Sequence, residues 1–230
     1  MNIGNRVIGY LNVGSCESFR SYWSAAPGYV PCGANAAAQL GPYGGYADEV
    51  WMNPAQPDYQ RLIIGYVAPR LVAQGVDGFF LDNLEVVEHG TDTANGPCDA
   101  ACAQGGLDLV RQLRTAFPQH LIVMQNATSD RTRSGTTGGL AFPTLLDGIS
   151  HEEVYAPQYD PEAERQLQSW RDLGLRPGGH PFFVATEDYV GGCDAVAAAQ
   201  RVYAASRAQG FSPYATDASA GQQGVCYWPF

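Results

Sequence analysis

The chain has 230 residues, of which 45% are hydrophobic and 16% charged, and its formal net charge is −10. The apolar fraction excludes a disordered chain, and the length suits one large domain or two small ones. The negative charge argues against nucleic acid or an anionic membrane as the main partner, because both are polyanions. A neutral or cationic ligand fits better.

Export and compartment can be judged from two features. No apolar run approaches the ~20 residues that span a bilayer, and the first eleven residues lack the pattern of a signal peptide. We therefore expect a soluble protein whose export signal, if it has one, lies outside this sequence. The cysteines are even in number and fit neither a zinc ribbon nor a redox CxxC: Cys16, Cys32, Cys98, Cys102, Cys193 and Cys226. They predict up to three disulfides, with Cys16–Cys32 and Cys98–Cys102 favoured as local pairs, and hence an oxidising compartment; the alternative is buried free thiols in a cytosolic protein.

Short apolar runs alternate with helical patterns along the chain. The predicted strands are residues 7–13, 78–81, 121–124, 148–150, 181–185 and 211–215, and the predicted helices are 58–74, 104–117, 161–173 and 194–209. Two long loops, 90–105 and 131–139, follow strands. Alternating strands and helices of this spacing predict a parallel sheet, and at this length one (β/α)8 barrel domain over residues 1–230.

Polar residues stand repeatedly at the ends of the predicted strands, which in a barrel open onto the active site. They are Asn12 and Glu17; Asp82 and Asn83; Gln125 and Asn126; His151, Glu152 and Glu153; and Glu187, Asp188 and Tyr189. Carboxylates gathered at one mouth suit glycoside hydrolysis or divalent metal binding.

Single residues also have structural interpretations. An Asp at a strand end is often a helix cap, but Asp82 precedes further acids rather than an obvious amphipathic helix. Glu152 and Glu153 are adjacent, so only one of them can point into the mouth. His151 is a hydrogen-bonding neighbour rather than a metal ligand, because no second His lies at ligand spacing. Aromatic candidates for stacking on sugars, with core packing as the alternative for each, are Tyr10, Trp51, Tyr155 and Tyr189.

Five segments together resemble glycoside hydrolase family 114, the endo-α-1,4-polygalactosaminidase-like barrels. They read GYLNVGSCESFRSYW, GVDGFFLDNLEVVEH, IVMQNA, LLDGISHEEVYA and FFVATEDYV. The resemblance implies a (β/α)8 barrel that cleaves α-1,4-linked galactosamine polymers with a catalytic Asp and Glu, which match Asp82 and Glu152. Its other site positions match Tyr10, Asn126, Asp188 and Tyr189.

The chain differs from that family pattern in two places. DNLE, with Glu85, replaces the frequent DNVD, so substrate contacts there are expected to differ. The chain also starts at what corresponds to the second strand, so we expect a barrel that lacks or replaces its first β/α unit.

The resemblance leads to a mechanistic hypothesis. Asp82 is the nucleophile and Glu152 the general acid and base, about 5–5.5 Å apart if the enzyme retains configuration and roughly 6.5–9.5 Å if it inverts. Asp188 and Glu17 are candidates to bind a substrate ammonium, with Asn83, His151 and the aromatic residues as further substrate contacts. We expect a cationic polysaccharide as partner, no cofactor or metal, and a secreted or extracytoplasmic monomer. The alternatives are a non-catalytic carbohydrate-binding barrel and, more weakly supported, a metal-dependent hydrolase.

Overall fold

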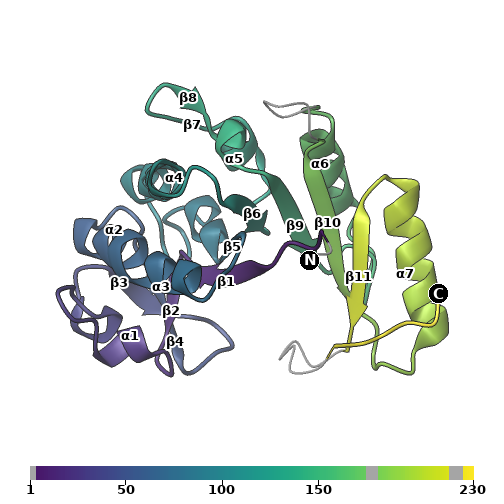
Figure 1. Ribbon diagram of the computed structural model, residues 1–230, viewed down its shortest axis with the longest axis horizontal. Helices are drawn as coiled ribbons and strands as arrows, with labels where there is room; N and C mark the ends of the chain where they lie inside the picture. Colours follow the sequence, from purple (N-terminus) through teal and green to yellow (C-terminus); the bar gives the residue numbers. More distant parts are fainter. Residues whose placement is uncertain (1–3, 175–180, 218–224) are drawn as a thin grey trace. The chain divides into compact units, whose positions relative to one another are not determined.

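The computed structural model describes residues 4–174, 181–217 and 225–230, and the chain forms two compact units, Met1–Leu146 and Asp147–Phe230 (Figure 1). The expectation of a single domain stays a prediction.

Three parallel strands organise the first unit: β1 (Ile8–Asn12), β5 (Gly78–Asp82) and β6 (Leu121–Gln125), in the order β1-β5-β6. All three confirm predicted strands. The register places Asn12 opposite Asp82 at the carboxyl ends of β1 and β5. The polar strand ends of these neighbours therefore lie at one edge.

An antiparallel sheet that the sequence patterns did not predict follows β1. It consists of β2 (Ser15–Glu17), β3 (Gln39–Pro42) and β4 (Glu49–Met52) in the order β2-β4-β3. The chain turns at Gly14, where an added Cβ would lie 1.7 Å from the carbonyl oxygen of Asn83. Only glycine permits this close approach, which brings β2 beside β4 and Glu17 opposite Glu49.

The helices of this unit broadly follow the predicted periodicity. The predicted helix 58–74 is present as α2 (Pro57–Leu62), the π-helical turn η2 (Ile63–Val67) and α3 (Ala68–Ala73). Helix α4 (Ala100–Ala116) begins earlier than expected because Asp99 caps it by accepting from the Cys102 amide. The remaining short elements are α1 (Ser21–Ser24), η1 (Cys32–Ala34), η3 (Leu84–Glu88), α5 (Asp130–Arg133), β7 (Thr136–Thr137), β8 (Leu140–Ala141) and η4 (Phe142–Leu145). Two of these, α5 and β7, fall at the expected loop 131–139.

The second unit contains parallel strands β9 (Gly148–Glu152), β10 (Phe183–Tyr189) and β11 (Ser212–Thr216), in the order β9-β10-β11. Its helices are α6 (Pro161–Arg171) and α7 (Val196–Ala208), and α7 runs alongside β11 (Figure 1). Strand β10 extends beyond the predicted 181–185, so that Glu187 and Asp188 lie inside the strand rather than after it.

The described residues thus contain six parallel strands alternating with helices, an α/β arrangement. A complete (β/α)8 barrel has eight such strands. The described residues hold six strands of this kind, the number that the apolar runs predicted.

Three disulfides pair all six cysteines: Cys16–Cys32, Cys98–Cys102 and Cys193–Cys226. The two local pairs predicted from the sequence are confirmed, and the alternative of free thiols is wrong. Disulfides in this number are typical of proteins from an oxidising compartment.

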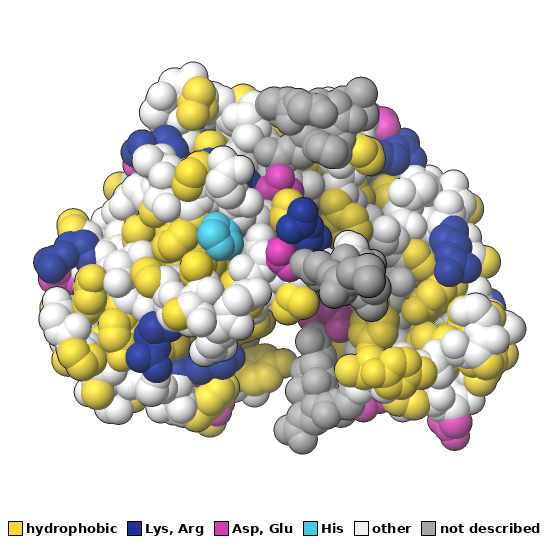
Figure 2. All heavy atoms as spheres, viewed as in Figure 1, with side chains coloured by type: hydrophobic (Ala, Val, Ile, Leu, Met, Phe, Trp, Pro, Cys, Tyr) yellow, Lys and Arg dark blue, Asp and Glu magenta, His cyan; other side chains and the backbone are white. Residues whose placement is uncertain are grey.

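The distribution of basic side chains on the surface agrees with the expectation that the main partner is not a polyanion. On the face shown in Figure 2, the described Arg side chains are scattered singly or in small groups and form no continuous basic surface. Within the residues that the structure describes, no helix is long and apolar enough to cross a membrane.

The disulfides are expected to contribute unequally to stability. Cys193 and Cys226 are 33 residues apart, whereas Cys98 and Cys102 are 4 apart. Because a longer closed loop restricts the unfolded chain more, replacing the first pair by Ala should lower the free energy of unfolding by about 3–4 kcal/mol and the second by about 2 kcal/mol. Urea-induced unfolding of both double variants measures this, and equal losses or the reverse order would contradict it.

Candidate active site

The predicted site residues are divided between the two units. The first unit holds Tyr10, Glu17, Trp51, Asp82, Asn83 and Asn126, and the second holds His151, Glu152, Tyr155, Asp188 and Tyr189.

Three strand ends share an unusual backbone conformation. Asn83, Asn126 and Glu153 directly follow β5, β6 and β9, with φ values of 61°, 56° and 55°. Among the described part of the chain they are the only residues other than glycine with positive φ. Side-chain-bearing residues adopt this conformation at a cost, and such residues cluster at functional sites. The polar strand ends recognised from the sequence therefore coincide with the strained turns.

Asp82 ends β5 and is partly exposed. Its Oδ2 accepts a hydrogen bond of 2.7 Å from the hydroxyl of Tyr10, on the neighbouring strand β1. Burial, and then the charge of Asp82, raises the pKa of Tyr10, so the phenol remains a donor at neutral pH. A donor on one oxygen favours the ionised carboxylate.

A buried polar network lies next to Asp82. The side-chain amide of Asn83 donates to Ser15 Oγ at 2.7 Å and to Glu49 Oε1 at 2.9 Å. Asn12 donates to the same two groups, and the Ser15 hydroxyl also donates to Glu49. The network fixes Asn83, the residue directly after Asp82, in its left-handed conformation.

Glu49 is a member of this site that the sequence analysis missed. It lies at the start of β4, in a segment without clear periodicity, and it reaches the network because β4 pairs with β2. Burial raises the pKa of the Glu49 carboxyl, Glu17 and Asp82 raise it further, and the hydrogen bond from Ser15 opposes this. No motif points to this residue; only the antiparallel pairing does.

Two predicted substrate contacts are placed differently from the expectation. Glu17 is 5% exposed and forms an ion pair of 2.9 Å with Arg20, so this carboxylate already holds a cation. Trp51 is 1% exposed, and its ring stacks on Tyr43 at 4.2 Å. Trp51 therefore packs in the interior, and its stacking partner is a tyrosine.

In the second unit, Glu152 ends β9 and is partly exposed. Its Oε1 accepts a hydrogen bond of 2.7 Å from the hydroxyl of Tyr189 on β10. Glu152 and His151 line a cavity of about 600 Å³ together with Glu153 and Tyr159. His151 Nδ1 lies 2.7 Å from the backbone oxygen of Glu152, which agrees with its expected role as a hydrogen-bonding neighbour.

Asp188 is fully buried, which differs from its expected contact with a substrate ammonium. Its Oδ1 accepts hydrogen bonds from the backbone amides of Tyr155 at 2.6 Å and Ala156 at 2.9 Å. Burial raises the pKa of the Asp188 carboxyl, while these two amides lower it. Asp188 is a positioning residue for the segment after β9. Tyr155, in that segment, is half-buried with its ring parallel to that of Tyr159 at 6.1 Å.

No group of three or more His, Cys, Asp or Glu side chains among residues 4–174, 181–217 and 225–230 could hold a metal ion.

The family model for glycoside-hydrolase family GH114 matches residues 2–130. The chain belongs to family GH114. Its fold is similar to two solved structures that are TIM-barrel glycoside hydrolases, which confirms the predicted fold class. The glycoside hydrolase domain of PelA from Pseudomonas aeruginosa has a TM-score of 0.66 and 19% identity, covering 97% of this chain and 82% of that one. Ega3 of Aspergillus fumigatus, solved in complex with galactosamine, has a TM-score of 0.65 and 17% identity, covering 93% and 75%.

A relative in sequence is an uncharacterized protein of Deinococcus radiodurans, 27% identical over 188 residues. The match covers 78% of this GH114 chain and 55% of the relative, so the chain spans about half the length of that protein.

Two substitutions at Asn83 separate conformational strain from hydrogen bonding. Both Asn83→Ala and Asn83→Gly remove the bonds to Glu49 and Ser15, but only Gly adopts a φ of 61° without a Cβ penalty. We expect the Gly variant to unfold with a free energy about 1 kcal/mol higher than that of the Ala variant. Chemical denaturation of both proteins measures the difference; an Ala variant as stable as the Gly variant would show that the left-handed turn imposes no strain.

Glu49 should make stability depend on pH. Because its pKa is raised in the folded state, its contribution is fully present below the ordinary value of 4.5 and is lost as the pH rises through the raised value. Gln keeps an oxygen that accepts the same hydrogen bonds but does not titrate. The free energy of unfolding of wild type minus that of Glu49→Gln should therefore fall as the pH rises from about 4 toward neutral. Denaturation across this range tests it, and a flat or rising difference would contradict it.

Proposed function

We propose that the protein is a retaining glycoside hydrolase that cleaves α-1,4-linked galactosamine-containing polysaccharide. Asp82 acts as the nucleophile, and Glu152 as general acid and then base. One observation distinguishes this pair from the other acids at strand ends. Asp82 and Glu152 are each partly exposed, and each accepts a 2.7 Å hydrogen bond from a tyrosine, Tyr10 or Tyr189, on an adjacent strand. Glu17 and Asp188 are instead buried.

The mechanism requires a different protonation state of each carboxyl group. The nucleophile must stay ionised, and the Tyr10 hydroxyl supports the charge on Asp82. The acid must carry a proton when the glycosidic bond breaks and become a carboxylate that activates water in the second step.

The choice of substrate is supported by charge and by similarity. The net charge of −10 attracts a cationic polymer such as deacetylated galactosamine. Ega3, with a similar fold, was solved with galactosamine bound. Among the acids around the polar network of the first unit, Glu17 is buried, whereas Asp82 and Glu49 are partly exposed, so an ammonium group can approach these two. The three disulfides support a secreted or extracytoplasmic protein. A monomer without cofactor or metal remains our prediction.

Hydrolysis by wild type and by two variants tests the catalytic pair. Asp82→Asn and Glu152→Gln keep the size of each side chain but remove the nucleophile or the proton donor. Each should lower the release of reducing ends from partly deacetylated galactosamine polymer by about 10³-fold or more. The matched controls are Asp58→Asn on α2 and Glu162→Gln on α6, two exposed acids that should leave the rate unchanged.

Undiminished activity in either catalytic variant would overturn the assignment. Binding of the polymer by wild type without release of reducing ends would favour the carbohydrate-binding alternative, and loss of activity on chelation the metal-dependent one. Retention predicts that the first product seen by NMR is the α-anomer, and a β-anomer would show inversion.

A further inference from the structure

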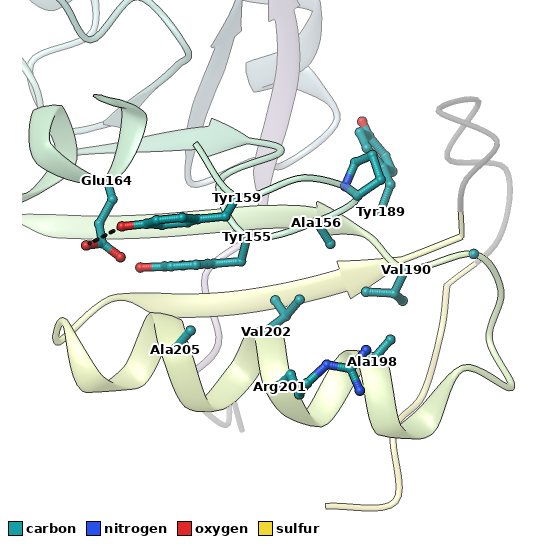
Figure 3. A pocket seen from close by; sticks show the side chains of 12 residues that line it. Tyr155, Ala156, Tyr159, Glu164, Tyr189, Val190, Ala198, Arg201, Val202 and Ala205 are labelled. Atoms are coloured by element: carbon teal, nitrogen blue, oxygen red, sulfur yellow. Dashed lines mark hydrogen bonds between the residues drawn. The ribbon is translucent and has the colours of Figure 1, made fainter. Parts of the chain in front are cut away.

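A second cavity, of about 770 Å³, lies within the second unit beside the segment that follows β9 (Figure 3). Its volume falls in the range of small-molecule sites, about 300–1,000 Å³. Tyr155 and Tyr159 form one wall with Glu164 of α6. The opposite wall is a stripe of α7 with helical spacing: Ala198, Arg201, Val202 and Ala205.

This cavity is adjacent to the one that contains Glu152. Both are lined by Pro157 and Tyr159. Tyr189 provides a second connection, because its ring lines the larger cavity while its hydroxyl bonds to Glu152. Tyr159 therefore lies at the border between the two cavities.

The lining of the larger cavity is amphipathic. The two tyrosine rings lie parallel, at an interplanar angle of 7°, and Tyr159 is 52% exposed, so its ring can be contacted by a ligand. Glu164 accepts a hydrogen bond of 3.2 Å from the Tyr159 hydroxyl, drawn as a dashed line in Figure 3. The Arg201 guanidinium extends from α7 on the opposite side (Figure 3). The cavity thus offers aromatic faces, one carboxylate and one cation.

We propose that this cavity is a secondary subsite, which binds a hexosamine residue of the polymer while another part of the same chain lies at Glu152. The proposal rests on the proposed function. The apolar face of the sugar packs on Tyr159, and its ammonium group pairs with Glu164.

Charge determines how the sugar is oriented. Arg201 repels an ammonium group and donates hydrogen bonds to hydroxyl oxygens, so the amine turns toward Glu164 and the hydroxyls toward α7. A free amine should therefore bind better than an N-acetylated one. The proposed preference for a free amine over an N-acetyl group therefore comes from Glu164, which is not one of the two proposed catalytic residues.

Binding to the full-length Glu152→Gln protein tests the subsite without turnover. Calorimetry with a long galactosamine oligomer should show the dissociation constant raised about three- to tenfold by Tyr159→Ala and about two- to fivefold by Glu164→Gln. The Glu164→Gln effect should vanish with the N-acetylated oligomer and shrink in high salt.

Matched controls exist in the same unit. Tyr227 is 88% exposed and does not line the cavity, so Tyr227→Ala controls for Tyr159→Ala. Glu162, also on α6 and exposed, controls for Glu164. Both controls should bind the long oligomer as the parent protein does.

The length of the oligomer distinguishes a binding role from a merely structural one, because a structural defect would affect long and short oligomers equally. In the active protein, Glu164→Gln changes a residue that lines the larger cavity but not the cavity of Glu152. This variant should raise KM for the long oligomer while leaving cleavage of the shortest cleavable oligomer unchanged. Equal losses on long and short oligomers, or dissociation constants that match the controls, would overturn the subsite. An equal effect of Glu164→Gln on amine and N-acetyl oligomers would overturn the ammonium pairing.

The two proposals fail in distinguishable ways. If the subsite is absent, wild type still releases reducing ends and only the subsite variants behave as the controls. If the proposed function is wrong, wild type neither cleaves nor binds galactosamine oligomers, and the subsite falls with it.

Discussion

A carboxylate inside a protein must receive hydrogen bonds or a cation, because its charge is otherwise too costly to bury. This requirement divides the acids of this chain into two groups. Glu17 is paired with Arg20, Asp188 accepts two backbone amides, and Glu88 accepts the amide and hydroxyl of Ser129. These three acids hold neighbouring parts of the chain in place. Asp82 and Glu152 are instead partly exposed, and each accepts a hydrogen bond from a tyrosine.

Another hydrogen-bonded acid, Glu49, shapes the surroundings of Asp82. Glu49 and Ser15 fix the Asn83 side chain, and Asn83 directly follows Asp82. The close approach of Gly14 to the Asn83 backbone permits this arrangement, because it turns β2 toward β4. A residue without an evident role in the sequence, Gly14, therefore controls whether the network can form at all.

The sequence predicted the features that follow from local pattern. The apolar runs identified six parallel strands, and local spacing identified two of the three disulfides. The antiparallel sheet escaped prediction because its strands have three or four residues each and pair across long separations. Glu49 was not predicted as a site residue for the same reason, because it lies in this sheet. The burial of individual acids was also not predictable from the sequence. The pattern TEDY places acids near a strand end, but it does not show that β10 continues through them and buries Asp188. Trp51 was a candidate for stacking on a sugar because it is aromatic. Only the structure shows that its ring already stacks on Tyr43.

The segment after β9 shows how a buried acid can position residues that border two cavities. Asp188 fixes the backbone at Tyr155 and Ala156, just before Pro157, and so sets where Tyr155 and Tyr159 stand. Pro157 and Tyr159 border both cavities of the second unit. Tyr189, the residue next to Asp188, donates a hydrogen bond to Glu152. Two successive residues of β10 therefore hold Glu152 and the segment that contains Tyr155. Adjacent side chains of a strand point to opposite faces, so the end of β10 can contact Glu152 through Tyr189 and the segment after β9 through Asp188.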